Sequence, residues 1–482
     1  MASNSEKITL IRGLGLVAAV SIIIGNVIGT GVFLKARVMT CNVGDPTWVI
    51  VAWVAAGVLS LAGALTYAEL SAMMPEAGGE YVFLKNAYGR VWSFLYGWML
   101  ILVGKTGAQA SIAVAFAIFL NDFLDGALKK TLIQTNIGGY PYELTSLQII
   151  AVMMIIIITT INCASVAVGG QLATVLTVVK IALVVLVGVG AFAFASGDFS
   201  HFAMTNAGGT CEGVAESVKY GAAGYGFAGG FGAAMLGALW GYDGWNNLTL
   251  VAGEVKNPQR NIPIALIGGT ILIIILYIFV NLAYFYVLTP TEIANVSRDS
   301  SVAKEVAARF LGAGAISLMA AGLMASSIGT LHTSILTGAR VPYAMARDGA
   351  FFQRFGQLSE ATRVPIVALV LQGLWACVLA LSGSFDTLTD YVIFGSWIFY
   401  GLATASVFVF RKTMPDAVRP YKAFGYPVVP ILFLLAAGWL LVNTMITAPF
   451  QSFAGIFLIL TGLPIYYFML PKTKEPENGN SE

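Results

Sequence analysis

The stretch GNVIGTGVF, residues 25–33, interrupts a run of apolar residues that is long enough to cross a membrane. Its three glycines weaken a helix, and Asn26 and Thr30 are costly in contact with lipid. Lipid satisfies no free backbone N–H or C=O group, so a break at this depth survives only inside protein or beside a watery cavity. The stretch therefore predicts a membrane helix that is broken at a buried site.

A broken helix brings backbone amides with partial positive charge and backbone carbonyls with partial negative charge to one place. The amides of Gly29, Thr30 and Gly31 would begin the second half-helix, where anions bind well, and we expect them to bind a carboxylate. The carbonyls near Val27 and Ile28 would end the first half-helix, where a cation is favoured. This pair suits a zwitterion. The alternative is close helix packing through small residues, since Gly25 and Gly29 are four residues apart.

The whole composition is that of an integral membrane protein. Of the 482 residues, 58 % are hydrophobic and 10 % are charged, and the mean hydropathy is +0.82. A spanning helix takes roughly 20 apolar residues, and we predict twelve such helices. They lie near 14–35, 48–74, 91–121, 146–163, 172–195, 232–250, 263–288, 313–335, 366–382, 390–410, 428–446 and 453–470.

The chain is predicted to form one membrane domain over residues 11–471. Residues 1–10 are a polar head and residues 472–482 a disordered tail. With an even number of spans and no signal peptide, both termini are expected in the cytoplasm. Sixteen Lys and Arg then lie in the inner segments and eight in the outer ones, as the positive-inside rule requires.

A second interrupted span is LWGYDGWNN, residues 239–247. It holds Trp240, Gly241, Tyr242, Asp243 and Asn246, and its carbonyls from Trp240 to Asp243 are further candidates for an ammonium group. If residues 14–195 and 232–410 are two repeats, both breaks fall in the first span of a repeat. Such paired breaks are typical of transporters built from inverted repeats. The spans within 428–470 are then additions.

Several classes of function lack sequence support. The chain has two histidines and no metal-binding, nucleotide-binding or hydrolase motif, so we expect neither a metal, a cofactor nor an enzyme, and no nucleic-acid partner. Four scattered cysteines do not make a disulfide framework, and a bridge between Cys41 and Cys211 is considered unlikely.

Four motifs resemble the amino acid–polyamine–organocation (APC) superfamily. They are GNVIGTGVF, YAELSAMMPEAGGEYVFL (67–84), LWGYDGWNNLTLVAGEVKNPQRNIPIAL (239–266) and ARVPYAMARDG (339–349). The third is most similar to the L-amino acid transporter branch. The resemblance implies an all-α fold of the LeuT type, with spans 1–5 and 6–10 as inverted repeats and helices 1 and 6 broken.

The same resemblance implies roles for individual residues. Gly29, Thr30 and Gly31 match the carboxylate-binding turn, and Val27 and Trp240 flank the carbonyls for the amino group. Trp240 matches the aromatic residue that closes over the substrate from outside. The alternative interpretation is that Trp240 is an aromatic residue of the membrane-buried core.

Lys180 lies about halfway along a predicted span, where an unpaired charge is costly. In sodium-independent members that the chain resembles, a matching lysine occupies the place of the sodium ion. Ser326, Ser327 and Thr330 are its expected hydroxyl partners. A buried lysine can also release its proton, so proton symport stays open.

Other polar residues in the spans have more than one interpretation each. Asp243 would favour cationic ligands, or pair with Lys105, or cap a half-helix. Lys105 would serve either a structural ion pair or transport. His332 is expected to be a packing residue and alternatively titrates. Glu69 and Glu254 are expected to form an inner gate or structural salt bridges.

These observations predict a sodium-independent secondary transporter of neutral L-amino acids in the plasma membrane, acting as exchanger or proton symporter. Alternatives are an antiporter of cationic amino acids or polyamines and an amino acid sensor that does not transport. Animal members of the resembled branch bind a glycoprotein through a cysteine after span 3. Residues 122–145 hold none, so no disulfide-linked heavy chain is expected.

Overall fold

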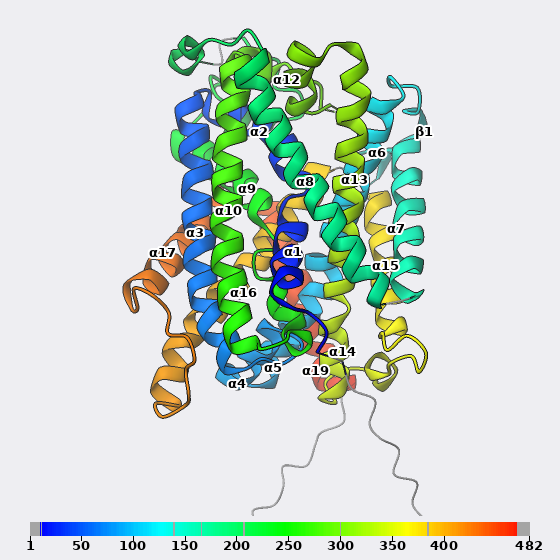
Figure 1. The fold of residues 1–482 in the computed structure, drawn as a ribbon, viewed down its shortest axis with the longest axis vertical. Coiled ribbons are helices and arrows are strands. Elements are labelled where there is room, and N and C mark those ends of the chain that lie inside the picture. The colour runs from blue at the N-terminus through cyan, green and yellow to red at the C-terminus, as the bar shows by residue number, and fades with distance from the viewer. Residues whose placement is uncertain are drawn as a thin grey trace, which may run out of the picture.

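The computed structural model is a bundle of long, roughly parallel helices (Figure 1). It describes residues 10, 12–137, 140–164, 166–205, 208–298, 300–382 and 385–469. The polar head before residue 10 and the tail 472–482 lie outside the described residues. The start of α1 (Leu16–Val27) points to the same end of the bundle as α19 (Gly462–Met469). We call this end the terminal face and the opposite end the hairpin face.

Twelve spans can be followed along the described residues, and their bounds agree with the predicted ones to within a few residues, except that spans 1 and 8 continue further. Among the described residues, nine helices are long and apolar enough to cross a membrane, and the remaining three spans are shorter or interrupted. In chain order the spans are α1 with α2 (Gly31–Val43), α3 (Pro46–Met73), α5 (Arg90–Met99) with η1 (Leu100–Gly104) and α6 (Lys105–Phe123), α7 (Ser146–Ala164), α8 (Val166–Phe194), α9 (Phe227–Tyr242) with η4 (Asn247–Glu254), α10 (Pro258–Val287), α13 (Ala313–Gly338) with α14 (Arg340–Arg347), α15 (Ile366–Ser382), α16 (Phe385–Thr413), α17 (Val428–Thr447), and α18 (Pro449–Leu460) with α19.

Short elements cap both faces. Helix α4 (Glu80–Tyr88) and η5 (Gln353–Gly356) lie toward the terminal face. The other short elements are η2 (Phe199–Ala203), η3 (Glu216–Val218), α11 (Pro290–Ala294) and α12 (Val302–Leu311), and they belong to connections at the hairpin face.

The packing follows the two predicted repeats. Spans 1–5 form one half and spans 6–10 the other, and the first four spans of each half pack against their counterparts. These contacts are α2 with α9, α3 with α10, α6 with α13, and α7 with α15. The fold is therefore of the LeuT type, with helices 1 and 6 broken at the centre of the bundle.

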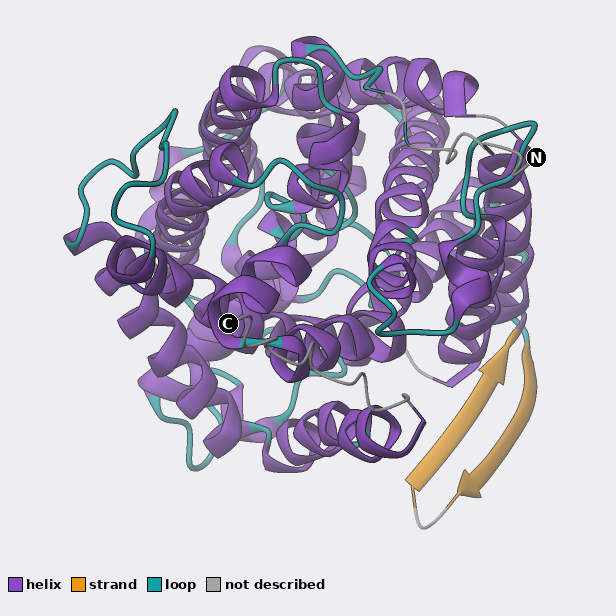
Figure 2. Ribbon diagram, turned by 90° about the horizontal axis from the view of Figure 1, so that it is seen from below, coloured by secondary structure: helices purple, strands orange, loops and turns teal. Residues whose placement is uncertain are grey.

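One element departs from an all-helical fold. Strands β1 (Thr131–Ile137) and β2 (Tyr140–Thr145) pair as an antiparallel hairpin after the third span. Figure 2 shows this hairpin projecting away from the helices. Strand β1 contains four β-branched residues, Thr131, Ile133, Thr135 and Ile137, which favour extended backbone.

A disulfide joins Cys41 and Cys211, whose Cα atoms are 5.6 Å apart. The expectation that this bridge is unlikely is wrong. The connection between α8 and α9 folds back over the end of α2, where the Tyr220 amide donates to the Cys41 carbonyl at 2.8 Å. Cysteines separated by 170 residues carry no sequence signal of such an approach.

The disulfide gives a stability prediction. We expect the double variant Cys41→Ser/Cys211→Ser to unfold at a lower temperature in detergent, because a native disulfide contributes about 2–4 kcal/mol. Replacing Cys377, which is a free cysteine, with Ala is the control and leaves Tm within a few degrees. Equal Tm values for the double variant and the unmodified chain would contradict a stabilising bridge.

Candidate functional site

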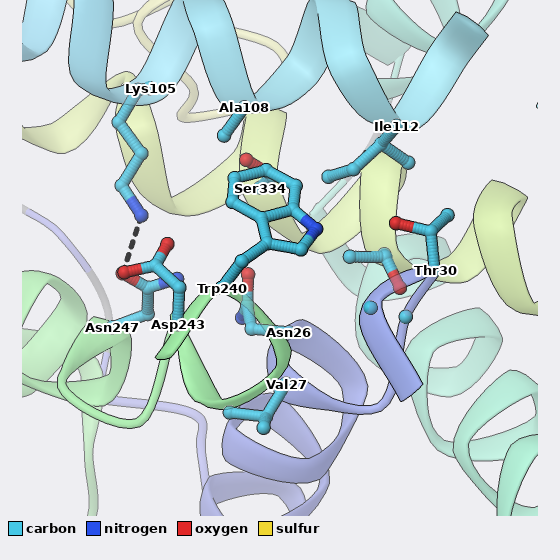
Figure 3. A pocket seen from close by; sticks show the side chains of 13 residues that line it. Asn26, Val27, Thr30, Lys105, Ala108, Ile112, Trp240, Asp243, Asn247 and Ser334 are labelled. Atoms are coloured by element: carbon cyan, nitrogen blue, oxygen red, sulfur yellow. Dashed lines mark hydrogen bonds between the residues drawn. The ribbon is translucent and has the colours of Figure 1, made fainter. Parts of the chain in front are cut away.

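A small cavity lies where the two helix breaks meet. Its walls come from both breaks together with α6 and α13, as Figure 3 shows. The lining residues are Asn26, Val27, Gly29, Thr30, Gly31, Lys105, Ala108, Ile112, Trp240, Asp243, Asn247, Thr330 and Ser334.

The first break is short. Helix α1 ends at Val27, residues 28–30 are not helical, and α2 begins at Gly31. The first amides of a helix have no partner inside it, so the start of α2 offers donors beside the cavity. Gly29, Thr30 and Gly31 all line that cavity.

The two breaks touch each other through glycines. A Cβ atom placed on Gly31 would lie 2.6 Å from the Cα atom of Gly241, which is too close for any side chain. Gly244 has a φ angle of +102°, which L-residues rarely adopt, and its Cα faces Asn26. Glycine is therefore needed for the close approach of the half-helices and for the turn between α9 and η4.

The carbonyl end of α1 is satisfied by side chains from three other helices. The Lys180 ammonium on α8 donates to the Gly25 carbonyl at 2.6 Å and lies 2.6 Å from the Thr330 hydroxyl on α13. The Tyr277 hydroxyl on α10 lies 2.8 Å from the Val27 carbonyl. Lys180 is fully buried. The break is therefore held from α8, α10 and α13 together.

The three expected hydroxyl partners of Lys180 are placed differently. Thr330 contacts the ammonium, as described above. The Ser326 hydroxyl is directed to the Ile28 carbonyl at 3.4 Å instead. The Ser327 hydroxyl donates to the Leu323 carbonyl of its own helix at 3.0 Å, a local bond that serine commonly makes in helices.

The second break is held by polar groups from three elements. The Tyr400 hydroxyl on α16 donates to the Asp243 carboxylate at 2.9 Å. The Lys105 ammonium donates to the Asn247 side chain, and the Asn246 amide donates to the Glu80 carboxylate on α4. The segment from Asp243 to Asn247 is therefore tied to α16, α6 and α4.

Lys105 does not form a direct ion pair with Asp243, although their charges interact. In Figure 3 its ammonium points to Asn247, with the carboxylate of Asp243 beside it. The cavity thus contains one cation and one carboxylate among its lining residues. Together they leave its wall close to neutral.

Trp240 occupies the centre of the site. Its indole lies between the α6 side chains Ala108 and Ile112 and the first break at Val27 and Thr30 (Figure 3). Only 7 % of the residue is exposed. A small movement of α9 would therefore change the shape of the cavity.

Not all of the residues that the sequence singled out reach the cavity. Val27, Gly29, Thr30, Gly31, Trp240, Asp243 and Thr330 line it. Ile28, Gly241, Tyr242, Asn246 and Ser327 are buried outside the lining set, and Lys180 and Ser326 contact the first break. His332 is fully buried and is outside the lining set.

The sequence analysis missed three residues that hold the breaks, namely Glu80, Tyr277 and Tyr400. Glu80 accepts hydrogen bonds from Asn246 and from the Tyr96 hydroxyl, the latter at 2.9 Å. It is part of the quoted motif at 67–84 and is fully buried. The sequence signal for this role of Glu80 was a carboxylate in a glycine-rich turn next to an apolar helix.

Glu69 and Glu254 form ion pairs toward the terminal face. Glu254 at the end of η4 pairs with Arg340 on α14 at 2.9 Å, and both side chains are buried. Glu69 at the end of α3 pairs with Arg411 on α16 at 2.6 Å. The end of the second broken helix is thereby tied to α14.

Comparison with known proteins fits this architecture. The family profile described as amino acid permease matches residues 14–470. The chain therefore belongs to the amino acid permease family of the APC superfamily. It is a multi-pass membrane protein of a family of amino acid transporters, and its relatives are transporters and not enzymes.

Three relatives illustrate the range within the family. The chain is 29 % identical to the serine/threonine exchanger SteT of Bacillus subtilis (strain 168) over 97 % of this chain and 98 % of that protein. It is 30 % identical to the b(0,+)-type amino acid transporter 1 of Homo sapiens, covering 97 % and 90 %. It is 29 % identical to the large neutral amino acids transporter small subunit 2 of Rattus norvegicus, covering 97 % and 82 %.

Proposed function

We propose that this protein carries neutral L-amino acids across the membrane by alternating access, without sodium. The observation that supports this most is the buried ammonium of Lys180 between the Gly25 carbonyl and the Thr330 hydroxyl. A fixed cation there supplies the positive charge that joins the first broken helix to α13. An added metal cation at the same place would be repelled.

In this proposal the cavity binds the backbone groups of the substrate at the two breaks. The amides of Gly29, Thr30 and Gly31 bind the carboxylate at the positive end of α2. The carbonyls at the ends of α1 and α9, near Val27 and Trp240, accept the ammonium. Both sets of groups come from moving half-helices, so substrate binding is linked to their positions.

Trp240 serves as the gate. Its indole already lies inside the cavity, and a rotation of this side chain would close or open one side of the site. Ala108 and Ile112 form the apolar surface for the substrate side chain. These contacts favour neutral ligands of small or medium size.

Two coupling modes fit this site. In an exchanger, Lys180 keeps its proton and the protein changes orientation only with substrate bound. In a proton symporter, Lys180 releases its proton when the contact with Gly25 opens. We favour the exchanger, because both contacts of the ammonium are made in this structure and one relative is named an exchanger.

A second candidate is an antiporter of cationic amino acids or polyamines. Asp243 supports it, because its carboxylate is in the cavity wall. Against it, the nearby ammonium of Lys105 offsets that charge and would repel a cationic side chain. The balance of charges therefore favours neutral substrates.

Asp243→Gly separates these two candidates. Under the neutral proposal we expect neutral uptake to be largely retained, because the part-buried hydrogen bond to Tyr400 is lost but no substrate contact is lost with it. If the protein takes cationic ligands, the same change abolishes lysine uptake. Uptake of labelled leucine and lysine is measured side by side, with Asp198→Asn in a hairpin-face connection as the control.

The orientation and partners belong to the same proposal. We propose a plasma-membrane protein with residues 11–471 as one transporter domain and both termini in the cytoplasm. The disulfide at the hairpin face suits an oxidising exterior, and the excess of Lys and Arg falls on the predicted inner segments. Residues 122–145 contain no cysteine, so we propose no disulfide-linked heavy chain.

The test of the substrate class is uptake into proteoliposomes that are preloaded with unlabelled leucine, in sodium-free buffer. Labelled serine, threonine, leucine and lysine are compared as external substrates. We expect uptake of neutral amino acids to exceed that of lysine by at least tenfold. Binding of leucine without any uptake would instead indicate a non-transporting sensor, and equal or preferred uptake of lysine would contradict the neutral assignment.

A further inference from the structure

The connection between α8 and α9 holds the end of α2 at the hairpin face. We call residues 210–225 of this connection the strap. The disulfide between Cys41 and Cys211 joins the strap covalently to the last turn of α2. Beside this bridge, the Asn42 side-chain amide donates to the Val218 carbonyl at 3.1 Å. The strap is therefore fixed to α2 at two adjacent buried residues.

Tyr220 of the strap covers the backbone where α2 ends. Its amide donates to the Cys41 carbonyl at 2.8 Å, one of the last carbonyls of α2, which have no partner within the helix. Its ring lies against Gly44, which ends α2 with a φ angle of +71°, and a Cβ atom on Gly44 would overlap that ring. The strap thus completes the cap of α2.

The strap also contacts the start of α9. The Tyr225 ring packs edge-on against the Tyr220 ring, with centroids 5.6 Å apart. A Cβ atom on Gly230, in the first turn of α9, would lie 2.5 Å from the Tyr225 ring and would overlap the Asn42 carbonyl oxygen. The strap and the end of α2 therefore meet α9 at one glycine.

Helices α2 and α9 approach closely along their whole length through glycines. Gly230 makes the contact under the strap, and a Cβ atom on Gly237 would lie 3.2 Å from the Met39 side chain. At the cavity, Gly31 lies against Gly241, as described above. Because α2 is one continuous helix of 13 residues, its position under the strap determines where its first amides lie at the cavity.

A third helix holds the strap from another side. The Thr210 amide donates to the Asn295 side chain at 2.8 Å, and the Cys211 amide donates to the Ala294 carbonyl at 3.3 Å. Ala294 is the last residue of α11, and it forms a buried apolar cluster with Cys41 and Cys211. The disulfide therefore lies where the strap, α2 and α11 meet.

We infer that the strap joins α2 and α9 into one unit, and that Cys41, Cys211 and Tyr220 are positioning residues for the substrate. They act through α2. By fixing its end at the hairpin face, they keep its first amides at a constant distance from the carbonyls of α9 when the cavity changes shape. A site that is ordered before binding spares the ligand the cost of ordering it.

This inference rests on the proposed function for the nature of the ligand, because the spacing suits a carboxylate and an ammonium group on one carbon atom. The coupling of α2 to α9 does not depend on that function. The two parts are therefore tested by separate readouts.

Two variants loosen the strap in different ways. Cys41→Ser/Cys211→Ser removes the covalent link, and Tyr220→Ala removes the ring over Gly44 while the disulfide stays intact. The control is Cys163→Ala/Cys377→Ala, which removes two free cysteines. All variants are measured well below the lowest Tm among them, so that loss of stability does not enter the comparison.

The first readout is hydrogen–deuterium exchange of the purified protein without ligand. We expect both strap variants to increase exchange in the peptides at the end of α2 and at the start of α9, and the control to leave them unchanged. Increased exchange at α2 alone, or at neither helix, would overturn the coupling. If the double serine variant does not fold, Tyr220→Ala decides the same question.

The second readout is leucine exchange in proteoliposomes. We expect KM for leucine to rise about fivefold in the double serine variant and about twofold in Tyr220→Ala, because the substrate must then order α2 against α9. The maximal rate is expected to change less, since the groups that line the cavity remain. A bridge that only stabilises the fold lowers Tm and leaves KM unchanged, and this result would overturn the positioning role alone. Inactive unmodified protein would contradict the proposed function and leave hydrogen–deuterium exchange to decide the coupling.

Discussion

Replacing Lys180 with alanine is expected to reduce amino acid exchange at least a hundredfold. The change leaves the Gly25 carbonyl and the Thr330 hydroxyl without their charged donor inside the membrane. Each buried group that loses a partner costs about 1–3 kcal/mol, and the loss of a charged donor lies at the upper end. Because the two contacts of Lys180 join α1 to α13, the arrangement of the first break in this structure loses this free energy.

The controls for Lys180→Ala come from its neighbours on α13. Thr330→Val removes one of the two contacts and is expected to slow exchange by about tenfold. Ser327→Ala removes a hydroxyl that bonds only to its own helix, and exchange is expected to stay within about twofold. Initial rates are measured at equal amounts of reconstituted protein. If Lys180→Ala exchanges as fast as Ser327→Ala, Lys180 has no part in the mechanism.

Substitution of Gly31 is expected to have an equally large effect. A Cβ atom at this position would lie 2.6 Å from the Cα atom of Gly241 and 3.1 Å from the Trp240 ring. One of these neighbours is backbone, so Gly31→Ala forces the two half-helices apart at the cavity. We expect loss of leucine exchange by more than a hundredfold, because the carboxylate and ammonium sites no longer have their spacing.

Gly268→Ala on α10 is the matched control, since nothing lies within 4 Å of a Cβ atom at that position. It is expected to preserve both exchange and Tm. Size-exclusion profiles and Tm of Gly31→Ala are measured as well, so that a local displacement is distinguished from misfolding. A folded Gly31→Ala variant with normal leucine exchange would contradict the close contact of the two breaks.

Much of the fold could be predicted because lipid imposes strict rules on the chain. Long apolar runs mark the spans, and polar or glycine-rich stretches inside them, such as those at 25–31 and 239–247, mark breaks that need protein around them. The predicted positions of the spans agree with the structure to within a few residues, apart from spans 1 and 8. These continue to Val43 and Arg347, because α2 and α14 extend with polar residues that apolar scanning leaves out.

The supporting residues could not be predicted in the same way. Tyr277 is one tyrosine in an apolar helix, and nothing in its neighbours indicates that its hydroxyl meets two carbonyls from other spans. Glu80 appears beside a glycine turn that has many possible uses. The bridge from Cys41 to Cys211 depends on how a long connection folds back over α2. Each of these contacts is set by tertiary packing between distant segments, which composition and spacing do not encode.

The hairpin after the third span shows that the structure of a connection outside the lipid is also hard to predict from sequence. Its β-branched residues fit a strand, but short polar connections in membrane proteins have no lipid constraint to reveal their structure. The prediction of an all-α membrane fold is therefore confirmed for the spans, and the hairpin is an addition that the sequence analysis did not predict.

The most direct measurement is efflux of preloaded radiolabelled leucine from sodium-free proteoliposomes, with and without unlabelled leucine outside. The proposed sodium-independent exchanger, with Lys180 as a fixed charge, predicts rapid efflux only when leucine is present outside, and no change when sodium is added. Efflux that needs sodium would contradict the central claim. Efflux that proceeds without external leucine and follows a pH gradient would replace exchange by proton symport, with Lys180 as the first residue to test as proton carrier.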